Sequence, residues 1–236
     1  MKLAIVGYGT VGQATQRTLK KGFMNDTEFV IHDPDKNLNG TWQDADIIFI
    51  CTPTDNVKEY LDAVPQEKHH DIIIRSTIDY NILGDEFMSA GVWPEFLTER
   101  TWVEDSRNPI CNILGGTLKQ LEVLKEVTFF NNFYHTTPKI AALMKVSTNT
   151  FYAMKVTFAN VLKTIAGDDY HELQKCLEKD ERMAADIHFQ VPGPDGKYGY
   201  GGKCFPQNLD MFGNFSTSAY FLTSTIEKLN EKYRSK

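Results

Sequence analysis

"LAIVGYGTVGQA", residues 3–14, decides the fold. The apolar run at residues 3–6 is typical of a buried strand, and Gly7, Gly9 and Gly12 follow it at G-x-G-x-x-G spacing. In such a strand-to-helix turn, the first glycine makes the tight turn and the second lets a diphosphate approach the backbone. The third lets the helix pack closely on the strand. The stretch therefore predicts a dinucleotide-binding loop made by Gly7, Gly9, Thr10, Val11 and Gly12.

An acidic residue follows at the position that such a loop requires. Asp33 ends a second apolar run, residues 28–33, and lies about 20 residues after Gly12. A carboxylate at the end of this strand accepts hydrogen bonds from the ribose hydroxyls and disfavours a 2′-phosphate. The sequence therefore predicts NAD rather than NADP as the cofactor.

The first half of the chain reads as alternating strands and helices. Apolar β-branched runs at 46–52 and 71–77 suit parallel strands covered on both faces. We expect a helix from Thr10 to Gly22, a trimmed loop at 34–45, later strands at 111–116 and 131–137, and a helix at 117–127.

The second half has a different pattern. It predicts a helix from Pro138 to Ala166, a second helix at 168–187, a loop at 190–206 and an amphipathic helix at about 216–233. We therefore expect an α/β fold. A Rossmann-type parallel sheet domain, residues 1–130, is followed by a mostly helical domain, residues 131–236, built on one long helix.

Composition excludes several classes of protein. The net charge is −6 and no long basic run occurs, so nucleic acid is not an expected partner. The four cysteines lack paired spacing, which argues against a metal site. No apolar run is long enough to span a bilayer, and the N-terminus lacks the pattern of a signal peptide. We expect a cytoplasmic protein with no membrane partner and no metal.

Cys204 raises a question of its own, because it follows a glycine-rich stretch in "GYGGKCFPQNLD", residues 199–210. Free cysteines are more often buried and inert than reactive. Lys197 and Lys203 could instead favour a nucleophilic thiolate. Composition and spacing leave both interpretations open.

Five stretches resemble segments of the UDP-glucose/GDP-mannose dehydrogenase family, and they occur in the order found in that family. They are "CTPTD" (51–55), "STI" (76–78), "WPEFLTERT" (93–101), "LMKVSTNTFYAMKVTFAN" (143–160) and "GYGGKCFPQN" (199–208). The resemblance implies an NAD-dependent, four-electron oxidation of the C6 alcohol of a nucleotide sugar to the carboxylate. UDP-glucose is the first substrate to expect. A thiolate that traps the intermediate aldehyde makes two oxidations possible in one site.

The resemblance also implies roles for individual residues. Cys204 would form the covalent adduct, and Lys145 with Asn149 would stabilise the C6 oxygen. Glu95 would activate water, which Thr77 helps to hold. The expected catalytic residues are Cys204, Lys145, Asn149, Glu95, Thr77 and Asn208. The expected substrate-binding residues are Glu95, Phe96, Leu97, Lys145, Asn149, Arg182, Tyr200, Gly201 and Gly202. Beyond the glycine loop, the expected cofactor-binding residues are Asp33, Thr52, Pro53, Thr54 and Thr77.

The polar residues of the long predicted helix support a site. Lys145, Asn149 and Asn160 share one stripe of an otherwise apolar helix. Polar side chains there are costly unless they meet a ligand or one another.

The chain departs from the family pattern near its end. Asn208 stands where the family has an acid, and Gln207 stands where it has a lysine. Only a short segment follows Asp210, so we expect the third, nucleotide-binding domain of the family to be missing. Two alternatives therefore stay open. One is an NAD-binding module or supporting subunit without turnover, and the other is a single-step dehydrogenase of the hydroxyacid type.

The long helix also predicts assembly. Its apolar residues point to several sides, and they are Leu143, Met144, Phe151, Met154, Val156, Phe158 and Leu162. A helix that is apolar nearly all round must be buried nearly all round. We expect a homodimer through the 138–166 helix.

Overall fold

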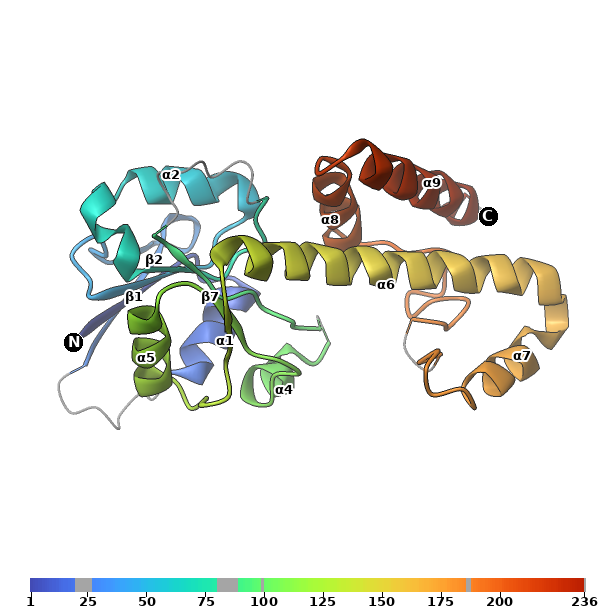
Figure 1. Cartoon of the computed structure of the whole chain (residues 1–236), viewed down its shortest axis with the longest axis horizontal. Helices are drawn as coiled ribbons and strands as arrows, with labels where there is room; N and C mark the ends of the chain where they lie inside the picture. Colours follow the sequence, from blue (N-terminus) through green and yellow to red (C-terminus); the bar gives the residue numbers. More distant parts are fainter. Residues whose placement is uncertain (20–26, 80–88, 99, 186–187, 236) are drawn as a thin grey trace. The chain divides into compact units, whose positions relative to one another are not determined.

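The protein folds into two compact units, residues 1–145 and 146–236 (Figure 1). The computed structural model describes residues 1–19, 27–79, 89–98, 100–185 and 188–235. The division lies later than the one expected at residue 130, because strand β8 (Tyr134–Thr136) pairs with the sheet of unit one. The first turns of helix α6 (Pro138–Ala166) also belong to unit one.

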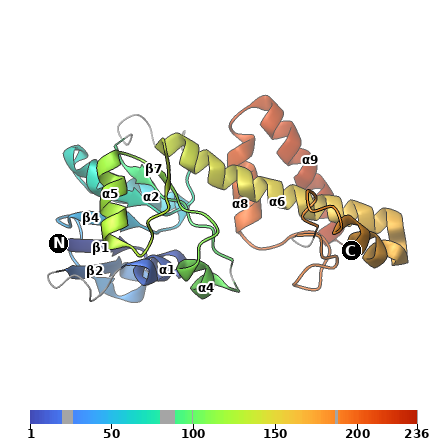
Figure 2. The same ribbon diagram turned by 60° about the horizontal axis from the view of Figure 1, so that its bottom comes forward.

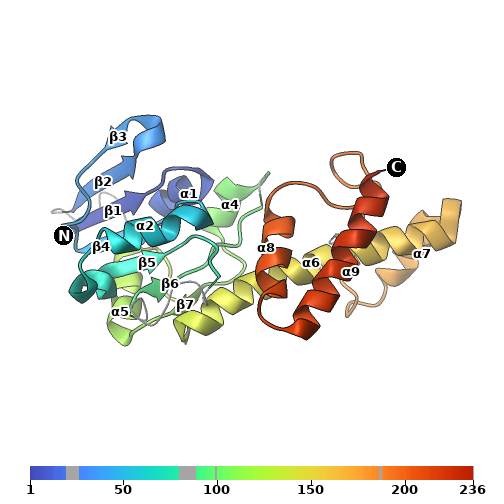
Figure 3. The ribbon, with the colours of Figure 1, turned by 90° about the horizontal axis from the view of Figure 1, so that it is seen from above.

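Unit one is built on one eight-stranded sheet, whose order is β3-β2-β1-β4-β5-β6-β7-β8 (Figure 3). Neighbouring strands are parallel except at the β2–β3 and β6–β7 pairs. This confirms the Rossmann-type sheet expected from the apolar runs. The other strands are β1 (Lys2–Val6), β2 (Glu28–Asp33), β3 (Leu38–Asn39), β4 (Ile47–Ile50), β5 (Ile72–Ile74), β6 (Gly91–Val92) and β7 (Ile113–Gly115).

Helices cover both faces of this sheet. Ile48 and Ile50 of β4 pack in one cluster with Val57 and Leu61 of α2 (Val57–Asp62). On the other face, Phe49 packs in a cluster with residues of α1 (Thr10–Thr18) and α5 (Leu118–Val127). Figure 2 shows α1 and α5 on the near side of the sheet and α2 behind it. The short helix α4 (Trp102–Arg107) packs beside α1.

Two predicted details of unit one were incomplete or wrong. The connection after β2 is short, as expected, but it forms a 3-10 turn (Pro34–Lys36) and the two-residue strand β3. Helix α1 ends at Thr18 rather than Gly22, because Leu19 turns extended and pairs with Thr128. Gly22 itself lies outside the described residues. Among the described residues of unit one, Thr54–Asn56 and Gln66–Asp71 also form 3-10 segments.

Unit two is helical. The predicted long helix is confirmed as α6, with 29 residues from Pro138 to Ala166. Gly167 ends it with a φ of 56°, in the left-handed region that glycine adopts most readily. A 3-10 turn (Gly167–Asp169), α7 (Tyr170–Leu177), α8 (Cys204–Gly213) and α9 (Thr217–Arg234) follow.

Two element boundaries in unit two were predicted wrongly. The second helix was expected to reach residue 187, but α7 ends at Leu177 and turns follow it. The loop expected to run to Pro206 ends at Lys203, and α8 begins at Cys204. Pro206 is compatible with this, because the first helical turn does not need its missing N–H.

In the described part of unit two, apolar side chains pack in two small clusters. Ala153, Leu209 and Ile226 join α6, α8 and α9. Ala159, Tyr170 and Phe189 join α6 to α7 and the segment after it. A bilayer-spanning helix was not found in the part of the chain that the structure describes.

Candidate functional site

The glycine loop between β1 and α1 has three glycines with different constraints. Gly7 has a φ of +85°, and a Cβ there would lie 2.8 Å from the backbone carbonyl of Cys51. A Cβ at Gly12 would lie 2.1 Å from the Gly7 oxygen. Gly9 has no atom within 4 Å of its would-be Cβ. Gly7 and Gly12 are therefore required for packing, whereas Gly9 leaves open space in front of the loop, where a diphosphate would bind.

Asp33 is positioned by this loop. Its Oδ2 accepts a hydrogen bond of 2.7 Å from the Tyr8 N–H. Lys36 lies beside it, with Nζ 3.9 Å from Asp33 Oδ2, and Lys36 donates to the Tyr8 carbonyl oxygen. Asp33 therefore binds the backbone N–H of Tyr8, and Lys36 binds its backbone carbonyl oxygen. Lys36 was not expected at the site from the sequence, although it is the first basic residue after Asp33.

The loops after β4 and β5 bind each other through hydroxyl groups. Thr54 Oγ1 donates to the Thr77 carbonyl oxygen at 2.7 Å, and Ser76 Oγ donates to the Thr52 carbonyl oxygen at 2.6 Å. Within the described residues, the buried Thr52 Oγ1 has no hydrogen-bond partner. Pro53 is exposed beside it.

These residues fit a dinucleotide. The open face at Gly9 suits a diphosphate at the start of α1, and Asp33 offers a ribose acceptor. The buried Thr52 hydroxyl is a polar group in need of a partner, at the carboxyl edge of the sheet where such ligands bind. The cofactor residues expected from the sequence therefore lie together, along the carboxyl ends of β1, β2, β4 and β5.

A buried ion pair occupies the segment after β6. Lys145 Nζ lies 3.1 Å from Glu95 Oε1, and both side chains are mostly buried, at 8% and 15% exposure. The Leu97 N–H donates to Glu95 Oε2 at 2.7 Å. Lys145 Nζ also lies 5.2 Å from the centre of the Phe96 ring. The structure therefore brings together four predicted substrate-site residues of unit one, which are Glu95, Phe96, Leu97 and Lys145.

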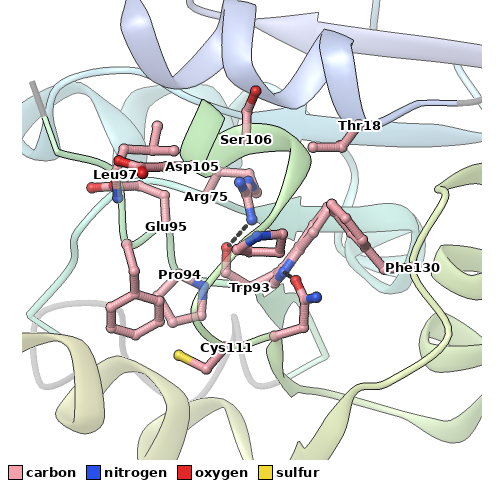
Figure 4. Close-up of a pocket in the computed structure, with 13 residues that line it drawn as sticks. Thr18, Arg75, Trp93, Pro94, Glu95, Leu97, Asp105, Ser106, Cys111 and Phe130 are labelled. Carbon is pink, nitrogen blue, oxygen red and sulfur yellow. Dashed lines mark hydrogen bonds between the residues drawn. The ribbon is translucent and has the colours of Figure 1, made fainter. Parts of the chain in front are cut away.

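Arg75 holds this segment through Trp93, a role that was not expected from the sequence. It is 5% exposed, its guanidinium stacks 3.8 Å from the Trp93 ring, and it donates to the Trp93 carbonyl oxygen at 3.1 Å (Figure 4). Its Nε donates to Thr15 Oγ1 of α1 at 3.1 Å. Burial lowers the pKa of Arg75 to about 10, which leaves it a cation at neutral pH.

Cys111 lies in the same pocket as Glu95, beside Pro94 (Figure 4). Burial raises the pKa of this thiol, and nearby Lys145 acts in the opposite direction. Cys51 is buried, and burial raises its pKa to about 11. Both thiols are therefore poor nucleophiles at neutral pH.

Cys204 is exposed and is the first residue of α8. Asn208 is 1% exposed, one turn later, and its amide donates to the Cys204 carbonyl oxygen at 2.8 Å. Its Oδ1 has no partner among the residues described. The Asn208 side chain therefore binds the backbone of Cys204 within the first turn of α8.

The other predicted site residues of unit two lie in different surroundings. The Tyr200 side chain is buried against Phe205 with ring centres 5.6 Å apart, and burial raises its pKa. Gly201 and Gly202 are exposed. Arg182 is exposed and pairs with Asp180, with Nη2 2.6 Å from Oδ2.

The polar residues that were expected to share one stripe of α6 lie in different surroundings. Asn149 is half-buried on α6, one turn after Lys145. Asn160 holds the backbone of the segment before Cys204, since its Oδ1 accepts from the Gly199 N–H at 3.0 Å. The expectation that these polar groups need partners is thus met by Glu95 for Lys145 and by the Gly199 peptide for Asn160.

Comparison with known proteins confirms the resemblance to a family. Residues 139–232 match the central domain of the UDP-glucose/GDP-mannose dehydrogenase family. The GDP-mannose 6-dehydrogenase of Pseudomonas aeruginosa is 27% identical over 203 residues, which cover 70% of this chain and 45% of that protein. The UDP-glucose 6-dehydrogenase of Campylobacter jejuni is 25% identical, and the match covers 98% of this chain and 72% of that protein. The chain spans about half the length of the first of these relatives.

Solved structures share the fold. A UDP-glucose dehydrogenase from Pyrobaculum islandicum superposes with a TM-score of 0.70 at 19% identity, over 98% of this chain and 68% of that chain. The 3-hydroxyisobutyrate dehydrogenase of Mycobacterium tuberculosis superposes with a TM-score of 0.65 at 14% identity, over 99% of this chain and 94% of that chain. NAD is the cofactor that these comparisons, together with the glycine loop, support.

The glycine loop allows a matched pair of variants. Gly12→Ala should destabilise the protein by about 1–3 kcal/mol, because its methyl group meets a backbone oxygen that cannot move away. Gly9→Ala should change stability by less than about 0.5 kcal/mol. It should weaken NAD binding by about tenfold, because its methyl group fills the open space before the loop. Urea unfolding and calorimetric NAD titration measure both effects. Unchanged NAD affinity in Gly9→Ala would exclude the loop as the diphosphate site.

Cofactor selectivity tests Asp33. We expect the wild-type protein to bind NAD more tightly than NADP. In Asp33→Ala the ratio of the NAD affinity to the NADP affinity should fall by about tenfold, because the ribose acceptor is removed. Asp35→Ala is the matched control, since Asp35 is exposed two residues away. Titration of each protein with both cofactors decides the matter. Equal or tighter NADP binding by the wild type would contradict the role assigned to Asp33.

Proposed function

We propose that the protein is an NAD-dependent dehydrogenase that oxidises the C6 alcohol of a nucleotide sugar to the carboxylate, with UDP-glucose as the first candidate substrate. One observation carries the proposal: Cys204, in the family's cysteine motif, is an exposed thiol at the first position of α8. The match of residues 139–232 to the family's central domain supports it.

The proposed reaction has two oxidations and one hydrolysis. NAD, held by the glycine loop and Asp33, would supply the hydride acceptor for each oxidation. After the first, the thiolate of Cys204 adds to the C6 aldehyde, and the resulting thiohemiacetal still carries a transferable hydrogen. The second oxidation leaves a thioester on Cys204. Water then displaces the thiol and gives the carboxylate, so one alcohol, one water and two NAD⁺ give one carboxylate, two NADH and three protons.

Lys145 and Glu95 take complementary roles in this proposal. The Lys145 ammonium donates hydrogen bonds to the C6 oxygen as that oxygen gains negative charge. The Glu95 carboxylate, whose Oε1 lies 3.1 Å from Lys145 Nζ, accepts a proton from the hydrolytic water. Asn149 is proposed as a further donor to the C6 oxygen. Thr77 is proposed to hold the water.

Substrate binding is proposed for the segment that contains Glu95 and for the glycine-rich segment before Cys204. Phe96 and Leu97 follow Glu95. The Leu97 N–H donates to the Glu95 carboxylate, and the Phe96 ring lies near Lys145 Nζ. Gly201 and Gly202 would leave room for the sugar beside Cys204. Tyr200 would act through its backbone, because its side chain is buried. Arg182, paired with Asp180 on the surface, is proposed to reach the substrate only if this pair opens.

A second candidate rests on the solved structures. The fold covers 94% of a 3-hydroxyisobutyrate dehydrogenase, so a single oxidation of a small hydroxy acid fits the same two-unit plan. Such a reaction does not need Cys204.

Cys204→Ser separates the candidates. A hydroxyl is a much weaker nucleophile at neutral pH, so formation of the sugar carboxylate should fall by at least about 10²-fold while NAD still binds. Cys176→Ser is the matched control, because Cys176 is also exposed but lies in α7. Mass spectrometry of the products measures the carboxylate. Native carboxylate formation by Cys204→Ser would make the cysteine structural, and NAD binding without turnover on any nucleotide sugar would favour a non-catalytic module.

We also propose a homodimer through α6. Phe151, Phe158 and Ile165 are 52%, 46% and 76% exposed and follow one another at seven-residue spacing, so they line one face of the helix. An exposed apolar stripe of this kind marks a protein interface, and the self-complementary stripe of a second copy is a suitable partner.

The dimer is tested by a charge on this stripe. Phe158→Asp should convert the wild-type dimer to a monomer at micromolar concentration, because a carboxylate would be buried without a partner. Glu122→Lys, on the exposed surface of α5, is the control for a change of charge. Sedimentation velocity reports the mass. A wild-type monomer with full activity would refute the dimer.

A further inference from the structure

The segment that leads into Cys204 is held by side chains of α9. We call residues 193–203 the cysteine loop. Asn230 binds it at two points, because its Oδ1 accepts from the Tyr200 N–H at 2.7 Å and its Nδ2 donates to the Tyr200 carbonyl oxygen at 3.1 Å. The Asn230 amide thus satisfies both polar groups of one loop residue, as a neighbouring strand would.

Asn160 holds the preceding peptide from α6. Its Oδ1 accepts from the Gly199 N–H, while its Nδ2 donates to the Val156 carbonyl oxygen of its own helix at 2.8 Å. Asn160 is 1% exposed, so its orientation is fixed. Two successive loop N–H groups are therefore held by two buried or half-buried amides on different helices.

Arg234 holds the other end of the loop. Its Nη1 lies 2.6 Å from Asp195 Oδ2, and this contact lowers the pKa of Asp195. Asp195 Oδ1 accepts from the Lys197 N–H at 3.1 Å. The Gly193 N–H donates to the Lys197 carbonyl oxygen at 2.8 Å, which closes the turn. Arg234 thus binds a turn that is already ordered.

Two glycines of the cysteine loop lie against the side chains of Asn230 and Arg234. A Cβ at Gly199 would lie 2.4 Å from Asn230 Oδ1, and its φ of +69° is also strained for other residues. A Cβ at Gly201 would lie 2.8 Å from Arg234 Nη2. Gly202, with a φ of +78°, has no atom within 4 Å of its would-be Cβ. Gly199 therefore lets α9 approach the loop closely, whereas a side chain at Gly201 would have to displace the guanidinium of Arg234.

We propose that Asn230 and Arg234 are positioning residues, which fix the cysteine loop and through it the place and direction of Cys204 at the start of α8. Only residues 201–203 separate the Asn230 contact from Cys204, and no helix or strand lies between them. A movement of the Tyr200 backbone should therefore also move the thiol of Cys204. The catalytic consequence rests on the proposed function, whereas the positioning of the loop does not.

Hydrogen exchange of the 236-residue chain tests the contacts of Asn230 and Arg234 with the cysteine loop, which we call the clamp, without any substrate. Asn230→Leu removes both amide bonds, and Arg234→Met removes the charge while it keeps the aliphatic chain. Each should raise amide exchange in the peptide covering the loop by at least about tenfold, because exchange follows local opening. The α5 peptide should not change. Lys232→Met is the matched control, since Lys232 is exposed on the same helix turn. Unchanged loop exchange in both variants would overturn the clamp.

Asn230→Asp guards against a variant that fails to fold. The carboxylate keeps an acceptor for the Tyr200 N–H but loses the donor to the Tyr200 carbonyl oxygen. Its loop exchange should lie between those of the wild type and Asn230→Leu. Exchange equal to the wild type would contradict the two-point contact.

A cycle of variants tests the contact between the glycine and the arginine. Gly201→Ala should lower the melting temperature in the wild-type background, because its methyl group displaces Arg234 from Asp195. In the Arg234→Met background the same substitution should lower it by less than half as much. Equal shifts in both backgrounds would show that Gly201 is required for another reason.

Turnover distinguishes positioning from simple stability. If the proposed function holds, Asn230→Asp should lower kcat by about tenfold and leave the dissociation constant of NAD unchanged, because only the thiol is displaced. Faster loop exchange with unchanged kcat would reduce the clamp to a structural role and overturn the positioning claim. If the wild type oxidises no nucleotide sugar, the proposed function fails, and the exchange experiment still decides whether α9 fixes the loop.

Discussion

The contact on which the site depends is the buried ion pair between Glu95 and Lys145. A buried ammonium is stable only with a partner, and removal of either charge would leave the other unpaired at a cost of about 3–5 kcal/mol. The pair fixes the segment after β6 against the first turns of α6 within unit one. Arg75 holds the same segment through Trp93 and reaches Thr15 of α1. The glycine loop and the ion pair are therefore supported by one set of contacts.

Much of the fold could be predicted because its signals are local. Apolar β-branched runs give the parallel strands, and the bounds of α6 follow from Pro138 and Gly167. The end of α1 could not be predicted, since Leu19 leaves the helix to pair with a residue far along the chain. The start of α8 was missed because Pro206 and the glycines suggest a loop, although proline is equally compatible with a first helical turn.

Only those residues of the candidate site that belong to a motif could be predicted from the sequence. Glu95, Lys145 and Cys204 stand in recognisable segments, but their partners do not. Arg75 follows an apolar run and resembles an exposed strand end, whereas the fold buries it against Trp93. Asn160 and Lys145 share a stripe of α6, yet Asn160 holds a loop peptide rather than a ligand. Spacing shows which residues share a face and leaves open what each of them meets.

The count of NADH formed per nucleotide sugar tests the central claim most directly. Wild-type protein is incubated with excess NAD and a limiting amount of UDP-glucose or a related nucleotide sugar until the absorbance of NADH stops rising. A four-electron oxidation through a covalent adduct on Cys204 predicts two NADH for each sugar consumed, with the carboxylate as the product. One NADH for each sugar, with an aldehyde or ketone as the product, would contradict the account and assign the chain to single-step dehydrogenases.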